Sequence, residues 1–82
     1  MWYVYMIRLD DNSIYTGITK DLERRMEEHE NGKGSKYVRS RLPLKLVYSE
    51  EHENKSSALK REAGIKKWSK RRKERFVSAK SS

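Results

Sequence analysis

Cysteine is absent from this chain of 82 residues. Its absence excludes disulfide bridges, thiolate metal sites and a cysteine nucleophile, and it suits a reducing compartment. Long apolar runs are missing too, because no stretch approaches the roughly 20 residues that a membrane-spanning helix requires. The first residues also lack a basic leader. We therefore expect a soluble, cytoplasmic protein without a membrane partner.

The short length limits the size of the core. A chain of this length forms one domain and buries only about 60% of the surface that its unfolded form exposes. We place this single domain at residues 1–79. Residues 80–82 are expected to form a frayed C-terminal tail.

Positive charge is concentrated in the C-terminal third. Residues 1–54 contain nine Lys and Arg against ten Asp and Glu, whereas residues 55–82 contain eleven against two. A one-sided basic surface attracts polyanions, so nucleic acid is the first partner to consider and an anionic membrane surface the second. The alternative is a solvated basic tail.

Two neighbouring segments have the pattern of a β-hairpin. Residues 2–9 are almost continuously apolar, which is typical of a central strand buried on both faces, and residues 13–18 read as its antiparallel partner. Between them, Asn12 can adopt the left-handed conformation that closes a three-residue loop. Pairing through this loop places Tyr5 opposite Gly17, and Tyr5 and Tyr15 then share one face.

The next segments predict a helix and a basic loop. The first helix is expected at residues 20–30 with Thr19 as its N-cap. Arg25 and His29 lie four residues apart, so they project from the inward edge of this helix. Residues 32–43 read as a functional surface loop rich in glycine and basic side chains.

The remainder predicts one strand and two helices. Residues 44–49 are expected to pair with the first strand, with Leu46 and Tyr48 on one face. Helices are expected at residues 55–68, capped by Asn54, and at residues 69–79. The predicted fold is α+β: a three-stranded, mainly antiparallel sheet with the first strand central, flanked by helices in the order β-β-α-β-α-α.

Glu62 is the most informative residue of the second helix. It lies between Ala58, Leu59 and Ile65, which places it in the middle of that helix's apolar face. A desolvated carboxylate must be paired or bound to a cation. An ion pair with an arginine such as Arg25 and a metal site are both open interpretations.

The order of these motifs resembles that of the GIY-YIG nuclease superfamily. The resemblance covers about residues 2–68 and is strongest to a small, stand-alone bacterial subgroup of uncharacterised function. Its motifs in this chain are Tyr3-Val4-Tyr5, Tyr15-Thr16-Gly17, Arg25, His29 and Glu62. Tyr3 and Thr16 depart from the usual first and second motifs. Val77 stands where many members have an asparagine.

The resemblance implies a nuclease site. Tyr5, Tyr15, Arg25, His29 and Glu62 would be its catalytic residues. Arg25 would clamp the scissile phosphate, since its planar fork suits two phosphate oxygens; its alternative is a salt bridge to Glu23, Glu28 or Glu62. Glu62 would hold one divalent ion, Mg²⁺ or Mn²⁺.

The two tyrosines and the histidine would divide the proton transfer. Tyr5 and His29 would act jointly as the base, because a phenol with a pKa near about 10 needs help at neutral pH. Tyr15 would orient the water or the phosphate. The alternative for each tyrosine is ordinary strand packing.

Basic residues outside this constellation are expected to follow the backbone of nucleic acid, with DNA as the first choice. They are Lys36, Arg39, Arg41, Lys66, Lys67, Lys70, Arg71, Arg72 and Lys73. Trp68 could stack on a base, although its spacing favours a core anchor. The expected activity is metal-dependent endonuclease activity by a one-metal mechanism, and the alternative is a nucleic-acid-binding module with little or no cleavage. The chain is expected to be a monomer or a weak homodimer.

Overall fold

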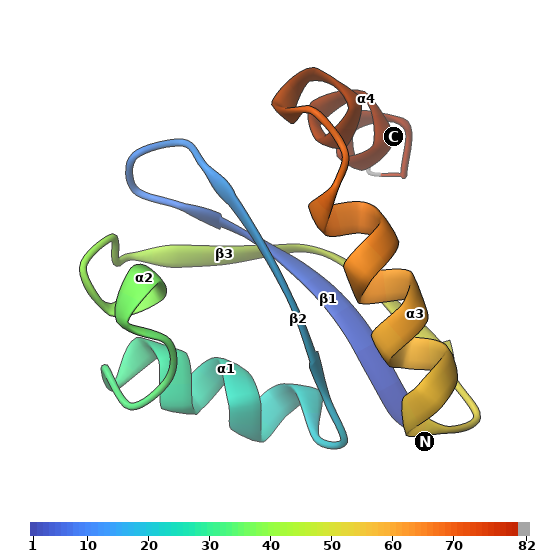
Figure 1. Ribbon diagram of the computed structural model, residues 1–82. Helices are drawn as coiled ribbons and strands as arrows, with labels where there is room; N and C mark the ends of the chain where they lie inside the picture. The colour runs from blue at the N-terminus through green and yellow to red at the C-terminus, as the bar shows by residue number, and fades with distance from the viewer. Residues whose placement is uncertain (81–82) are drawn as a thin grey trace.

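The computed structural model describes residues 1–80 and contains a three-stranded antiparallel sheet. Its strands are β1 (Trp2–Leu9), β2 (Ile14–Thr19) and β3 (Leu44–His52), in the order β2-β1-β3 (Figure 1). The continuous apolar run of β1 is explained by its central position, because both of its faces are covered. The predicted α+β fold, its element types and the central first strand are confirmed, with one short helix added.

The hairpin has the predicted register. Tyr5 pairs with Gly17, and the Leu9 amide donates to the Ser13 carbonyl oxygen at 2.9 Å. Asn12 adopts a positive φ of 69°, as the three-residue loop requires. The loop chemistry alone therefore fixes which side chains of β1 and β2 share a face.

β3 differs from the prediction because it contains a bulge. Met6 pairs with Tyr48, but the next residue of β1, Ile7, pairs with Leu46, so Val47 is an extra residue in β3. Leu46 and Tyr48 consequently lie on opposite faces of the sheet. The expectation that they share a face was wrong, because period-two counting fails across a bulge.

Helix α1 (Leu22–Glu30) begins two residues later than expected. Its N-cap is Asp21, whose carboxylate accepts a hydrogen bond from the Arg24 amide at 3.1 Å. Thr19 instead accepts a bond from the Asp21 amide at 3.1 Å. The prediction of Thr19 as the cap was wrong because Asp21 supplies the competing capping oxygen closer to the helix.

The predicted surface loop contains the short helix α2 (Lys36–Arg39). The Ser35 hydroxyl caps it by accepting from the Tyr37 amide at 3.1 Å. Val38 is fully buried under the sheet. Val38 packs with the core residues of β1, and the Asp10 amide donates to the Arg41 carbonyl oxygen at 2.9 Å, so the expectation of a plain surface loop was incomplete.

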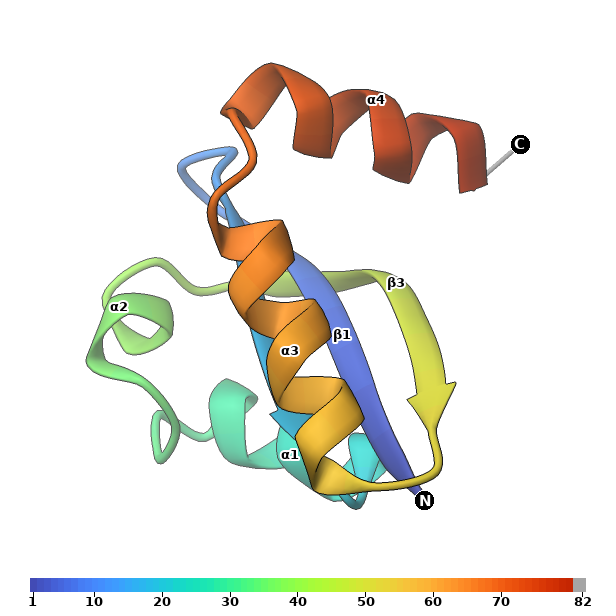
Figure 2. The same cartoon turned by 45° about the vertical axis from the view of Figure 1, so that its right-hand side comes forward.

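Helix α3 (Lys55–Lys66) is capped by Asn54, as predicted, and ends before Trp68. The Trp68 ring packs against Phe76 of α4, with centroids 5.2 Å apart, and borders the core. The core-anchor interpretation of Trp68 is therefore confirmed. In Figure 2, α3 runs along the sheet and α4 leaves its end at a steep angle.

Helix α4 (Lys70–Lys80) begins after Ser69, whose hydroxyl accepts from the Arg72 amide at 3.1 Å. The helix includes Lys80, one residue beyond its predicted end at residue 79. The rest of the predicted tail, residues 81–82, lies outside the described residues. No helix within residues 1–80 is long and apolar enough to cross a membrane.

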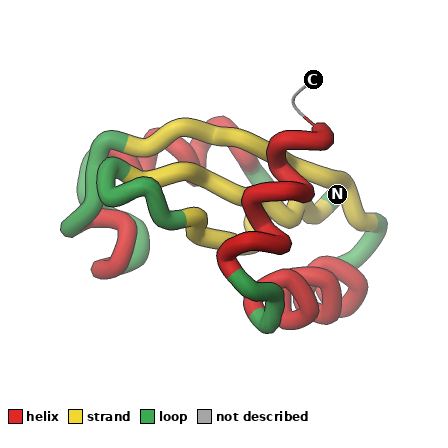
Figure 3. The backbone as a smooth tube through the Cα atoms, turned by 90° about the horizontal axis from the view of Figure 1, so that it is seen from above, coloured by secondary structure: helices red, strands yellow, loops and turns green. Residues whose placement is uncertain are grey.

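The core consists of two clusters, one on each face of the sheet. Figure 3 shows the sheet and the helices packed on it from above. The cluster under α3 and α4 contains Val4, Met6, Ile14, Ala58, Ile65 and Val77. The cluster under α1 and α2 contains Tyr5, Ile7, Leu9 and Val38. Tyr5 is therefore both a core residue and a candidate site residue, on the face that carries α1.

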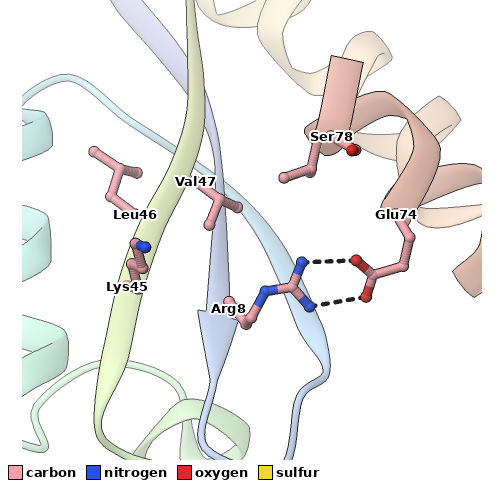
Figure 4. A pocket seen from close by; sticks show the side chains of 7 residues that line it. Arg8, Lys45, Leu46, Val47, Glu74 and Ser78 are labelled. Atoms are coloured by element: carbon pink, nitrogen blue, oxygen red, sulfur yellow. Dashed lines mark hydrogen bonds and ion pairs between the residues drawn. The ribbon is translucent and has the colours of Figure 1, made fainter. Parts of the chain in front are cut away.

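Arg8 and Glu74 join β1 to α4 beside an open hollow of about 410 Å³ between β3 and α4 (Figure 4). Arg8 donates two hydrogen bonds to the Glu74 carboxylate, at 2.8 and 2.6 Å. None of the predicted catalytic residues lines this hollow. The pair is a structural clamp between elements that are far apart in the sequence.

We expect Glu74→Gln to lower the free energy of unfolding by about 1 kcal/mol, or the melting temperature by about 4–8 °C, at neutral pH. The hydrogen bonds from Arg8 hold the pKa of the Glu74 carboxyl below its usual range. Because the folded-state pKa is the lower one, this contribution is present above roughly pH 4 and is lost as the pH falls through the folded-state pKa. Thermal melts of both proteins across this range test it, with exposed Glu53→Gln as the control. A difference that persists in strong acid would contradict it.

Candidate active site

The hairpin register brings two tyrosines together beneath α1. Tyr5 of β1 and Tyr15 of β2 have ring centroids 6.4 Å apart. The His29 ring of α1 completes a triangle, at 5.8 Å from each tyrosine ring. Three of the five predicted catalytic residues therefore meet on one face of the sheet.

His29 is fully buried and forms a short hydrogen bond with Tyr5. Its Nε2 lies 2.8 Å from the Tyr5 hydroxyl oxygen, whereas its Nδ1 has no hydrogen-bond partner within residues 1–80. Burial lowers the pKa of His29 below its ordinary value, and the positive charge of Arg25 acts in the same direction. The imidazole is therefore neutral at physiological pH.

Arg25 lies one turn before His29 and reaches the same cluster. Its guanidinium lies beside the Tyr5 hydroxyl and also hydrogen-bonds the Glu28 carboxylate at 3.3 Å. The salt bridge to Glu28 that was weighed as an alternative is thus present. It is a partly exposed pair that leaves the guanidinium at the site.

The electrostatics of Tyr5 reflect its burial. Burial raises the pKa of the Tyr5 hydroxyl above its ordinary value, and the adjacent Arg25 guanidinium opposes this rise. The Glu62 carboxylate, and Tyr15 in its ionised form, add to this rise. Ionisation of Tyr5 therefore depends on the positive charge of Arg25 and on hydrogen-bond donors around its oxygen.

Glu62 of α3 acts electrostatically on the Tyr5 hydroxyl. Within α3 the buried residues are Ala58 and Ile65, whereas Leu59 is 43% exposed. Glu62 therefore lies at the margin of the buried stripe. The prediction that it lies in the middle of this stripe was wrong. Its side chain is 17% exposed, so its carboxylate is accessible from solvent.

The partner of Glu62 is a lysine. Its carboxylate lies 3.3 Å from Nζ of Lys66, and no ion pair with Arg25 occurs among residues 1–80. The same Nζ lies 6.0 Å from the centroid of the Tyr15 ring. Lys66 therefore connects the candidate metal ligand with the tyrosine cluster.

The single carboxylate of Glu62 fits a hard divalent ion whose other ligands are mainly water and substrate phosphate. No group of three or more His, Cys, Asp or Glu side chains that could hold a metal occurs in the described part of the chain. Mg²⁺ commonly binds through one or two carboxylates, water and substrate phosphate. A single accessible carboxylate is compatible with that mode and not with an all-protein cage.

Two residues of the site were missed from the sequence. Gly34 packs directly against His29, so closely that a Cβ atom at this position would overlap Nδ1. The Tyr37 ring of α2 stacks on Tyr15, with centroids 6.2 Å and planes 24° apart. An aromatic residue within a basic segment was the available signal for Tyr37, but its contact with β2 depends on the placement of α2.

The predicted nucleic-acid-binding residues divide into two groups. Lys36, Arg39, Lys67 and Arg71 are exposed. The others contact the protein itself: Arg41 with Asp11 and the Tyr37 ring, Lys66 with Glu62, Lys70 with the Asn12 carbonyl, and Arg72 with the Trp68 ring. Both groups keep a charge at the surface.

Val77 and His52 lie away from the tyrosine cluster. Val77 is 4% exposed and belongs to the core under α3 and α4. His52 hydrogen-bonds Ser57 and Glu50, each at 2.6 Å. This network ties β3 to the start of α3 on the face opposite to Tyr5.

Gly17 is required by the close approach of the Tyr5 ring. A Cβ atom at Gly17 would lie 2.5 Å from the Tyr5 hydroxyl oxygen and 2.7 Å from Cζ. Because Tyr5 is only 1% exposed, it has little room to yield. We expect Gly17→Ala to cost about 1–3 kcal/mol in urea unfolding.

Gly64→Ala is the matched control. No atom lies within 4 Å of a Cβ atom at Gly64, which is exposed within α3. The same substitution there should stabilise the protein by about 0.5–1 kcal/mol, since alanine favours the helix. If both variants shifted the urea midpoint in the same direction, the overlap with Tyr5 would not be the cause.

Comparisons with known proteins point to one family. The sequence model of the GIY-YIG catalytic domain matches residues 1–75. UPF0213 protein SSP2268 of Staphylococcus saprophyticus is 46% identical over 76 residues, which cover 93% of each chain. UPF0213 protein YhbQ of Escherichia coli is 47% identical over 77 residues, which cover 94% of this chain and 77% of that one. The solution NMR structure of UPF0213 protein BH0048 from Bacillus halodurans has a TM-score of 0.63 and 43% identity, covering 98% of this chain and 86% of that one.

Proposed function

This chain belongs to the GIY-YIG catalytic domain family, and on that premise we propose that it is an endonuclease that hydrolyses phosphodiester bonds in DNA with one divalent metal ion. The observation that carries the proposal is the convergence of Tyr5, Tyr15, His29 and Arg25 on one face of the sheet. A purely structural core would not require an arginine, a neutral histidine and two phenols at one place. We propose the cytoplasm as its location.

Tyr5 is the residue that takes a proton from the attacking water in this proposal. An unpaired buried N–H is rarer in proteins than an unpaired acceptor, so we assign the His29 proton to Nε2. Nε2–H then donates to the Tyr5 oxygen and stabilises its ionised form, as does the Arg25 guanidinium. The Tyr15 ring contacts the rings of Tyr5 and His29, and its hydroxyl orients the water or the phosphate.

Arg25 and Glu62 share the charge on the phosphate. Arg25 hydrogen-bonds two phosphoryl oxygens, whose negative charge grows in the transition state. Glu62 would hold the divalent ion, which when bound supplies Lewis-acid stabilisation and a more acidic water. Lys66 must leave the Glu62 carboxylate when a cation binds there, and its ammonium group is then available to a neighbouring phosphate oxygen.

Incubating supercoiled plasmid with purified protein and Mg²⁺ or Mn²⁺ tests the proposal. We expect the wild type to produce nicked circles, and Glu62→Ala and Arg25→Ala to produce none. Equal nicking by all three proteins would indicate a contaminating nuclease and refute the proposal.

A nucleic-acid-binding module with little or no cleavage is the second candidate. It is favoured by the burial of Val77 in the core, because no side chain at that position reaches the tyrosine cluster. Such a module would bind DNA with a steep salt dependence and cut under no divalent ion. Turnover that depends on Glu62 would exclude it.

A further inference from the structure

A small hollow lies where the hairpin, α2 and the first turn of α4 meet. Its volume is about 180 Å³, and its lining residues are Ser13, Ile14, Tyr37, Lys70 and Lys73. They contribute two ammonium groups and two hydroxyls, and no carboxylate is among them. The Ser13 hydroxyl already donates to the Asp11 carboxylate at 2.5 Å, so the two ammonium groups and the Tyr37 hydroxyl are the donors that the hollow offers.

The two lysines of the hollow are paired with carboxylates only weakly or not at all among the described residues, so their ammonium groups can attract an anion. Lys73 forms no ion pair within residues 1–80. Lys70 donates to the Asn12 carbonyl at 2.8 Å and lies 3.7 Å from the Glu74 carboxylate. That carboxylate is already held by Arg8 at 2.6 Å, so it neutralises Lys70 only in part.

The hollow adjoins the tyrosine cluster through Tyr37. Tyr37 forms part of its wall and stacks on Tyr15. Lys66 lies over the same Tyr15 ring and beside Glu62. Lys66 therefore lies near Tyr15 of β2, and Lys70 and Lys73 lie beside Ile14 at the start of the same strand.

The size of the hollow suits one phosphate group. Its volume is well below the roughly 300–1,000 Å³ of pockets that hold drug-sized ligands. Ammonium and hydroxyl groups are the donors that contact nucleic-acid backbones without reading sequence. A base would find one aromatic ring here, Tyr37, and that ring is already stacked between Tyr15 and the Arg41 guanidinium.

We propose that this hollow is a second anion subsite, which holds a backbone phosphate that flanks the scissile one on the same DNA strand. The position of the scissile phosphate at the tyrosine cluster rests on the proposed function. The subsite fixes the path of the bound DNA strand, which passes over the β2 edge of the sheet and not over β3. Lys73 is its main cation, because that side chain forms no ion pair among the described residues.

Binding of a fluorescein-labelled DNA duplex of about 20 base pairs tests the subsite. Fluorescence anisotropy is measured between about 50 and 200 mM salt without divalent metal, so that cleavage does not contribute. Lys73→Gln should lower the slope of log K against log salt by about 0.9, the value of one lost phosphate contact. Lys73→Arg should keep the wild-type slope, and Lys45→Gln, which makes the same charge change at β3, should also leave it unchanged.

The outcomes separate the subsite from the nuclease. A wild-type slope for Lys73→Gln, or an equal decrease for Lys45→Gln, would overturn the subsite even if the protein nicks plasmid. A selective decrease for Lys73→Gln in a protein that never nicks would support the subsite and reject the nuclease. Absence of any DNA binding by the wild type would overturn the subsite directly.

Discussion

Glu62→Gln should reduce the rate of plasmid nicking by about 10³-fold, because Lewis-acid stabilisation of the phosphoryl charge is worth several kcal/mol. The substitution preserves the size of the side chain and leaves an amide oxygen for Lys66 at its present distance of 3.3 Å. It removes only the negative charge. Since no group of three ligating side chains occurs among residues 1–80, the other ligands of the ion would be mainly water and substrate phosphate.

Binding of Mn²⁺, followed by electron paramagnetic resonance, provides a readout that does not depend on activity. The wild type should bind the ion in the presence of a DNA duplex, and Glu62→Gln should bind it much more weakly. Glu53→Gln is the matched control, since this exposed glutamate precedes α3. Equal Mn²⁺ binding by Glu62→Gln and the wild type would remove Glu62 from the metal site.

Tyr5→Phe is the second large expected loss, about 10²–10⁴-fold in single-turnover nicking, which is the usual contribution of a positioned general base. The ring remains, so packing against Gly17 is kept. The hydroxyl is lost, and with it the 2.8 Å hydrogen bond to Nε2 of His29. Because Nδ1 of His29 already has no partner in the described chain, the ring would then be wholly unsatisfied. This adds a stability cost of about 1–3 kcal/mol.

Tyr48→Phe separates catalysis from stability. Tyr48 and Glu50 lie on the face of the sheet opposite to Tyr5. The Tyr48 hydroxyl donates a 2.6 Å hydrogen bond to the Glu50 carboxylate, so the loss of this hydroxyl should also destabilise the protein. It should leave nicking unchanged at a temperature at which both variants are folded. If Tyr48→Phe and Tyr5→Phe lost activity in proportion to their stability, Tyr5 would have only a structural role.

Local sequence was sufficient to predict the hairpin and the relative placement of Tyr5 with Tyr15 and of Arg25 with His29. The loop closed by Asn12 sets the pairing of Tyr5 with Gly17, and a strand's period of two then places Tyr15 on the same face. The four-residue spacing of Arg25 and His29 places both on one side of α1. These relations depend on turn chemistry and helical geometry within a few residues, so they can be predicted without knowledge of distant contacts.

Long-range packing decided the rest. The extra residue Val47 reversed the face of Leu46, and no residue type near it signals a bulge. The contacts of Gly34 with His29 and of Tyr37 with Tyr15 exist because buried Val38 holds α2 against the sheet.

The sequence by itself indicated the family through the order of its motifs and the fold through its hydrophobic patterns. It also determined the inward-facing residues of the hairpin and of α1, because these follow from short-range geometry. Only the tertiary structure decided that Glu62 lies at the margin of α3 beside Lys66 and not in its buried stripe. It alone also placed Lys70 and Lys73 beside Tyr37. The physical reason is that burial depends on which surface a helix meets, and that surface is built by residues far away in the chain.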